Sequence, residues 1–154
     1  MALNDIEALL DRSLPYSYKQ LVKSIEDFAY FDFNEFPNEH PDDEGSSWFF
    51  WDEKRLCESV QVDGIKNCAA WQQLVLHIEI DKQTRQRNFA PSPGGPVAHE
   101  RLKKTICFAE DNADLLYIDP TDENSIWIYM HDSGEVKRIA VSFDEWIGRA
   151  RRCE

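Results

Sequence analysis

The sequence lacks any apolar run close to the roughly 18 residues that a membrane-spanning helix needs. Its start also lacks the basic residues and apolar segment of a secretory signal peptide. The four cysteines form no Cys-x-x-Cys pair, and without a secretory signal free thiols are favoured over disulfides. These absences predict a cytoplasmic protein that has no membrane segment.

Motifs for catalysis and for cofactor binding are missing as well. There is no G-x-S-x-G nucleophile motif, and Gly94-Gly95 is not part of a phosphate-binding or dinucleotide-binding pattern. The four histidines are scattered without metal-ligand spacing, so no metal and no cofactor are predicted. Cys107 lies in an apolar stretch, where a thiol is usually an inert core residue. The sequence therefore predicts a protein that is not an enzyme.

The net charge of −12 is unevenly distributed along the chain. Residues 1–62 carry 14 acidic and 5 basic side chains, and residues 105–134 carry 7 acidic side chains and no basic ones. Such blocks argue against nucleic acid and anionic lipid as partners, because both are bound through Lys and Arg. They suit a basic protein partner, although solubility alone also explains them.

The N-terminal half predicts helices, a loop and a short strand. A helix start is indicated at Asn4, and apolar residues at helical spacing predict a second helix that reaches Ala29. Residues 34–47 are typical of a loop, and residues 48–51 of a strand. Trp48 and Trp51, within that strand, are expected in the core.

The middle of the chain is less regular. Asp52 is expected to cap a short helix that carries Leu56 and Val60 and ends at Gly64. Residues 66–80 fit both helical and strand periodicity, and their length and Ala69-Ala70 favour a helix. Residues 81–99, basic and then rich in Pro and Gly, predict a long surface connection.

The C-terminal third has the clearest pattern. Four strands are predicted over residues 105–108, 115–118, 125–130 and 135–141, with a hairpin turn at Asp132-Ser133-Gly134. Ser142 and Glu145 form a capping box for a last helix. The order of elements predicts a single α+β domain over residues 1–154, with an antiparallel meander and flanking helices.

Two acidic groups are the candidate partner-binding sites. One lies in the loop before Trp48, and the other lies on the strand ends and turns of the meander. If these turns share one edge of the sheet, their carboxylates form a continuous negative rim; ordinary turn chemistry is the alternative. The candidate residues are Glu39, Asp42, Asp43, Glu44, Glu110, Asp111, Asp114, Asp119, Asp122 and Glu123.

Three stretches occur in an order that is known from one family. They are LPYSYKQL (residues 14–21), ICFAEDNADLLYID (residues 106–119) and IAVSFDEWI (residues 139–147). Together they resemble SMI1/KNR4-like domains of the SUKH superfamily. The resemblance implies an antiparallel sheet with flanking helices. It also implies, for bacterial members, immunity proteins that bind and block toxins, often nucleases, without chemistry of their own.

Two other functions remain open at this point. A small hydrolase could use dispersed carboxylate and histidine residues, with His131 and Asp132 as the candidates. A scaffold subunit of a regulatory complex, as some fungal members of the family are, would present an apolar patch instead of an acidic one. A histidine or glutamate buried in a cleft would favour the enzyme, and an open face would favour a binding protein.

Overall fold

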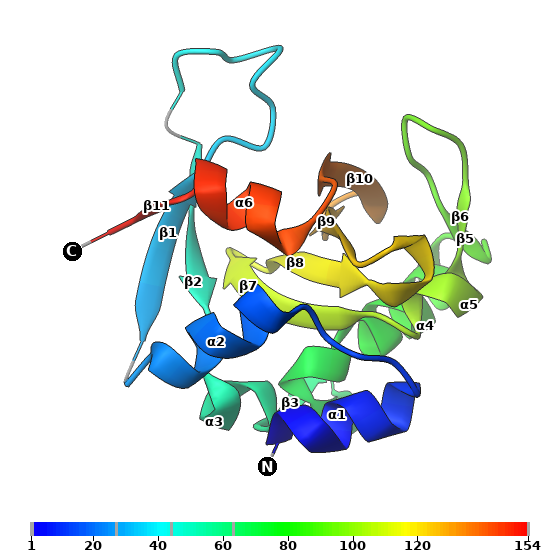
Figure 1. Cartoon of the computed structure of the whole chain (residues 1–154). Helices are drawn as coiled ribbons and strands as arrows, with labels where there is room; N and C mark the ends of the chain where they lie inside the picture. The colour runs from blue at the N-terminus through cyan, green and yellow to red at the C-terminus, as the bar shows by residue number, and fades with distance from the viewer. Residues whose placement is uncertain (1, 27, 44, 63, 154) are drawn as a thin grey trace.

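A seven-stranded antiparallel sheet forms the centre of the computed structural model, which describes residues 2–26, 28–43, 45–62 and 64–153 (Figure 1). The strand order is β10-β9-β8-β7-β2-β1-β11. The strands are β1 (Ala29–Phe33), β2 (Ser46–Phe50), β7 (Ile106–Asp111), β8 (Asp114–Asp119), β9 (Ser125–Met130), β10 (Glu135–Ala140) and β11 (Arg151–Arg152).

Helices cover both faces of the sheet, so the predicted α+β class is confirmed (Figure 1). The first face is covered by α2 (Tyr16–Ser24) and α6 (Phe143–Arg149), and the second by η1 (Ala70–Gln72), α4 (Leu74–Thr84) and α5 (His99–Leu102). The remaining elements are α1 (Ala2–Leu10), α3 (Glu53–Leu56), η2 (Pro120–Asp122), and the hairpins β3 (Ser59–Val62)–β4 (Ile65–Ala69) and β5 (Phe89–Ala90)–β6 (Val97–Ala98). None of the helices in the described ranges has the length and hydrophobicity to cross a membrane.

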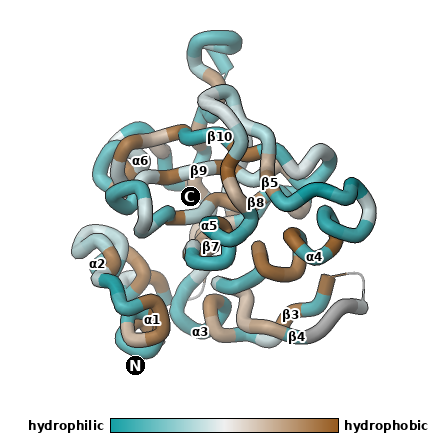
Figure 2. Tube along the Cα trace, turned by 90° about the vertical axis from the view of Figure 1, so that its right-hand side faces the viewer, coloured by the Kyte–Doolittle hydropathy of each residue, from teal (hydrophilic) through white to brown (hydrophobic). Residues whose placement is uncertain are grey.

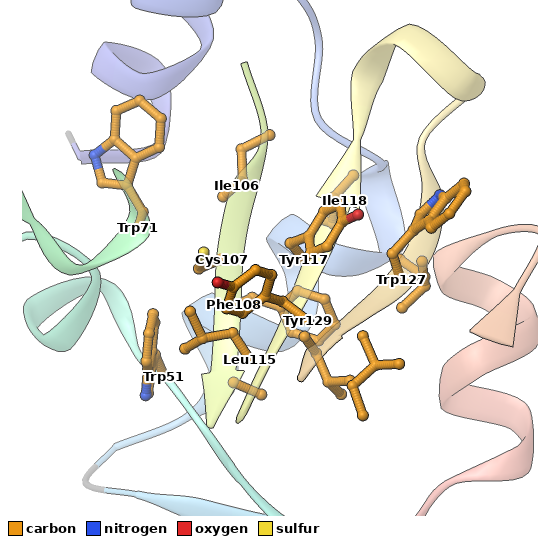
Figure 3. Packing of buried hydrophobic residues seen from close by; sticks show 14 of the residues in the cluster. Trp51, Trp71, Ile106, Cys107, Phe108, Leu115, Tyr117, Ile118, Trp127 and Tyr129 are labelled. Atoms are coloured by element: carbon orange, nitrogen blue, oxygen red, sulfur yellow. The ribbon is translucent and has the colours of Figure 1, made fainter. Parts of the chain in front are cut away.

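The central strands are buried on both faces, which explains their continuous apolar sequences. On the first face, the ring of Phe108 lies 5.8 Å from Phe143 and 5.4 Å from Trp146. On the second face, α4 is hydrophobic along much of its length (Figure 2). Buried side chains from β7, β8 and β9 pack between these layers (Figure 3). The expectation that Trp48 and Trp51 belong to the core is confirmed, since both are fully buried.

The C-terminal prediction holds closely for β8, β9 and β10, whereas β7 continues three residues past its predicted end, to Asp111. Strand β9 has the predicted bounds, and β10 ends one residue earlier than predicted. The Ser142 hydroxyl accepts a hydrogen bond from the Glu145 backbone N–H at 3.1 Å, as expected of the cap.

The predicted second helix is wrong at its C-terminal end. Helix α2 stops at Ser24, and Ala29 begins β1. Phe28 and Ala29 continue the helical spacing, but Ala29, Phe31 and Phe33 also alternate as in a strand. Pairing of β1 with β2 over five residue pairs, a contact between distant residues, decides the outcome.

The middle segment departs further from the prediction. The Asp52 carboxylate caps α3 as expected by accepting from the Arg55 N–H at 2.8 Å, but Val60 lies on β3 and Gly64 lies between two strands. The predicted helix at 66–80 is correct only from Leu74 onward, because β4 and η1 precede it. The connection at 81–99 contains the end of α4 and the β5–β6 hairpin.

The turn between β7 and β8 carries a strained residue. Asn112 and Ala113 are the two residues between the paired Asp111 and Asp114, and both have positive φ, 49° and 73°. A hairpin turn of this kind favours glycine at its second position, and alanine there is strained. We expect Ala113→Gly to raise the free energy of unfolding by about 0.5–1 kcal/mol in urea denaturation. An unchanged or lowered value would show that the turn is not strained.

Candidate functional site

The first acidic group lies in the loop between β1 and β2, the topmost segment in Figure 1. Glu39, Asp42 and Asp43 are exposed there, and Glu44 lies outside the described residues. The loop holds its own shape, because the Asn34 side-chain amide donates to the His40 carbonyl at 2.6 Å and the Gly45 N–H donates to Asp43 at 2.9 Å. Its carboxylates are thus presented to solvent on an internally hydrogen-bonded loop.

The second acidic group is divided between two ends of the sheet. Glu110, Asp111 and Asp114 lie at the turn from β7 to β8, whereas Asp119, Asp122 and Glu123 lie at the other end of β8. Successive turns of an antiparallel meander alternate between the two ends of the strands. The continuous negative rim considered for these six residues is therefore not formed.

Asp119 and Asp122 serve the structure of their turn. Asp119 is buried; one of its oxygens accepts from the N–H and hydroxyl of Thr121, and the other accepts from the Arg101 Nε at 2.7 Å. Asp122 accepts from the Ser125 hydroxyl at 2.5 Å and lies 3.9 Å from both Arg101 and Arg138. The turn-chemistry alternative describes these two residues.

The other acidic residues lie at one end of the sheet. Strand β2 is antiparallel to β7, with Phe49 opposite Glu110. The loop that precedes β2 and the turn that follows β7 therefore lie beyond the same end of the strands. The structure thus places two acidic groups from distant parts of the sequence on one side of the molecule; they comprise Glu39, Asp42, Asp43, Glu110, Asp111 and Asp114.

The three stretches that resemble a known family meet in the core. Tyr18, from the first stretch, lies 5.8 Å from Phe108 of the second and 5.2 Å from Phe143 of the third, measured between ring centres. Phe108 and Phe143 are 5.8 Å apart. The three stretches thus share a role in core packing, in which edge-to-face contacts between their rings hold α2, β7 and α6 against one another.

The model of the SMI1 / KNR4 family (SUKH-1) matches residues 2–149. The chain belongs to this family. No match was found among curated proteins or among solved structures.

In this SMI1/KNR4 chain, His131 and Asp132 do not form a recognisable catalytic site. The Nδ1 of His131 lies 2.7 Å from Asp114, and its Nε2 lies 3.0 Å from Asp132, which is 92% exposed. Within the described parts of the chain, neither nitrogen contacts a hydroxyl or a thiol. Cys107 is fully buried, and burial raises the pKa of its thiol to about 12, so it is a poor nucleophile.

A hollow of about 430 Å³ has no arrangement of acid, base and nucleophile among the described residues that line it. It is lined by Arg101, Trp127, Lys137 and Arg138, with Asp122 as its carboxylate and Ser92 from the β5–β6 loop. Asp122 lies 3.9 Å from both Arg101 and Arg138, so its negative charge is already balanced by the two arginines. Across the described ranges, there is also no group of three or more His, Cys, Asp or Glu residues that could hold a metal ion.

Sequence reasoning missed a buried ionic cluster around Asp81, whose side chain is only 2% exposed. Arg85 and Arg87 donate to its two oxygens at 2.8 Å, and the His99 Nε2 lies 3.2 Å away. Burial raises the pKa of Asp81, but the hydrogen bonds from Arg87 and Arg85 outweigh it, so the pKa lies below its ordinary value. Burial lowers the pKa of His99.

This cluster anchors the β9–β10 turn. Arg85 donates to the Asp132 carbonyl and Arg87 to the Ser133 carbonyl, both at 2.6 Å. A Cβ on Gly134 would come within 2.8 Å of the Asp81 carboxylate, so the turn packs directly on the cluster. No sequence spacing reveals such a cluster, because Arg87 and His99 reach Asp81 through the tertiary fold.

Proposed function

We propose that this member of the SMI1/KNR4 family is a non-enzymatic protein-binding module that acts as an immunity protein, binding and neutralising a basic toxin domain. The favoured toxin is a nuclease, since nucleases hold phosphate with Lys and Arg. The observation that carries the proposal is the position of carboxylates from two sequence blocks at one end of the sheet, where Glu39, Asp42 and Asp43 are exposed and Glu110, Asp111 and Asp114 are half-buried.

The charge distribution supports a binding role for the end of the sheet that carries the β1–β2 loop, and not for the end that carries the turn between β8 and β9. Glu39, Asp42 and Asp43 are exposed, and among the described residues their one ion pair is the 3.9 Å contact of Glu39 with Lys137, although Asp43 also lines a hollow with Arg149 and Arg151. Their field would attract a basic partner and raise its association rate. The complex is expected to weaken as salt rises, because exposed charges are screened.

Growth rescue tests this proposal. The chain is co-expressed with basic nuclease toxin domains from its own source organism, each toxic to the host when expressed alone. We expect growth to be restored with one of them and lost again when Glu39, Asp42 and Asp43 are all replaced by lysine. Charge reversal at the interface reduces affinity because it replaces attraction with repulsion.

A matched triple variant separates position from net charge. Glu79, Glu100 and Asp144 are also exposed, and their replacement by lysine changes the net charge equally. This variant should still restore growth. Failure of the unaltered protein against every basic toxin domain of that organism would overturn the proposal, and equal loss in both triple variants would remove the loop between β1 and β2 from the interface.

A further inference from the structure

One row of side chains crosses the sheet on its second face. Directly opposed residues of antiparallel strands point to the same face, so the strand register defines the row. From β1 to β10, its members are Tyr30, Phe49, Glu110, Leu115, Tyr129 and Val136.

Helix α4 covers only part of this row. Leu115, Tyr129 and Val136 are buried, and His77 of α4 lies 5.2 Å from the Tyr129 ring. At the β1–β2 end, Tyr30 is 41% exposed and the neighbouring Phe28 is 63% exposed. The second face is therefore open where β1 and β2 extend beyond the helix.

Three rings on this open part of the sheet form an aromatic ladder, consisting of Phe28, Tyr30 and Phe49. Tyr30 stacks on Phe49 with ring centres 5.3 Å apart, and Phe28 meets Tyr30 edge to face at 5.9 Å. Exposed, mutually ordered aromatic side chains are typical anchors of protein interfaces, because they bury a large area at low entropic cost.

Carboxylates border the ladder. A groove of about 380 Å³ begins at Phe49 and is lined by Asp52, Glu58 and Glu110, together with Lys54 and Arg55. These are the only two basic residues in the segment 26–58, which carries 11 acidic ones. The ladder residues thus belong to a strongly acidic segment of the sequence, and Arg151 and Arg152 of β11 pair with β1 on its other side.

Arg55 demonstrates how this surface holds a cation. Its guanidinium lies 5.3 Å from the centre of the Trp51 ring, 2.8 Å from Glu58 and 3.6 Å from Glu110. An aromatic ring below a cation and carboxylates beside it are a favourable combination. Tyr30 and Phe49 offer the same combination to an incoming side chain, with Glu110 next to them in the row.

We infer that the aromatic ladder is the docking surface for a protein partner that presents arginine or lysine side chains, which lie on Tyr30 and Phe49 and direct their charge to Glu110 and the groove. This inference rests on the proposed function and names the surface and chemistry of that binding. Phosphate groups are excluded by the carboxylates. A second copy of this chain would bring two acidic surfaces together.

Peptide titration followed by NMR tests the surface directly. An arginine-rich peptide, its lysine counterpart and its glutamate counterpart are added to the labelled protein at about 20 mM salt, where exposed charges are weakly screened. We expect the arginine and lysine peptides to shift the amide signals of Tyr30, Phe49 and Glu110, and the glutamate peptide to leave them unchanged. In Phe28→Ser/Tyr30→Ser, affinity should fall at least about fivefold.

Tyr16→Ser is the matched control, since Tyr16 is 74% exposed on α2, away from the ladder. It should bind the peptides as the unaltered protein does. Shifts confined to the loop between β1 and β2 would overturn this inference and leave the proposed function standing. Absence of shifts, equal binding of the glutamate peptide, or self-association of the protein through Tyr30 would also overturn it, while growth rescue would still report separately on toxin neutralisation.

Discussion

Replacing Trp146 by alanine is expected to lower the free energy of unfolding by about 3–5 kcal/mol, measured by urea denaturation. The indole is fully buried in α6 at the centre of the first face. Its ring lies 5.7 Å from Phe31, 5.8 Å from Phe33 and 5.4 Å from Phe108. The substitution leaves a cavity among rings from two strands, Phe31 and Phe33 on β1 and Phe108 on β7, whose pairing within the sheet prevents them from moving in to fill it.

Two variants control for this result. Trp146→Phe should cost much less than alanine, because it keeps a ring and removes the buried Nε1–H, which has no hydrogen-bond partner among the described residues. Phe28→Ala should leave stability nearly unchanged, since Phe28 is largely exposed. A loss below about 1.5 kcal/mol for Trp146→Ala would contradict the central position of this ring in the core.

Replacing Asp81 by alanine is expected to cost about 2–3 kcal/mol of unfolding free energy. The change leaves Arg85, Arg87 and His99 without their shared acceptor. Arg85 is 34% exposed and can be hydrated, so the loss should stay below the 3–5 kcal/mol that is typical of a broken, fully buried pair. Hydrogen exchange should accelerate in residues 85–99 and in the β9–β10 turn, which the cluster holds together.

Asp132→Ala is the matched control for Asp81, because this nearby carboxylate is almost fully exposed. This variant should have the same free energy of unfolding as the unaltered protein, because the backbone carbonyl of residue 132 still accepts from Arg85. If Asp81→Ala were as stable as this control, the cluster would not anchor the turn, and the connection at 85–99 would be held by other contacts.

Local signals explain what could be predicted from the sequence. The bounds of β9 and the Ser142 cap of α6 depend on short-range alternation and on a side chain next to its own helix. The predicted C-terminal end of α2 is wrong because Phe28 and Ala29 fit both helical and strand periodicity. Only the pairing of β1 with β2 decides between the two structures. The β3–β4 hairpin was missed for the same reason, since residues 66–69 fit either structure.

The candidate site was predictable only in part. The acidic composition indicates a basic partner, but the position of each carboxylate depends on the sheet. The sequence places Asp119 in the same acidic group as Asp111 and Asp114, although the fold buries it against Arg101. The aromatic ladder is not apparent from the sequence, because Phe28 fits helical spacing and the stacking depends on the register between Tyr30 and Phe49.

The central claim is neutralisation by binding without turnover, and a stoichiometric inhibition assay tests it most directly. A toxin domain identified by growth rescue is held at constant concentration, and increasing amounts of this protein are added before nuclease activity is measured. We predict that activity falls in proportion to the amount added, reaches zero near one equivalent, does not change with incubation time and partly returns at high salt. Progressive loss of activity at substoichiometric amounts would instead show that the protein acts on the toxin as an enzyme, and would contradict the account.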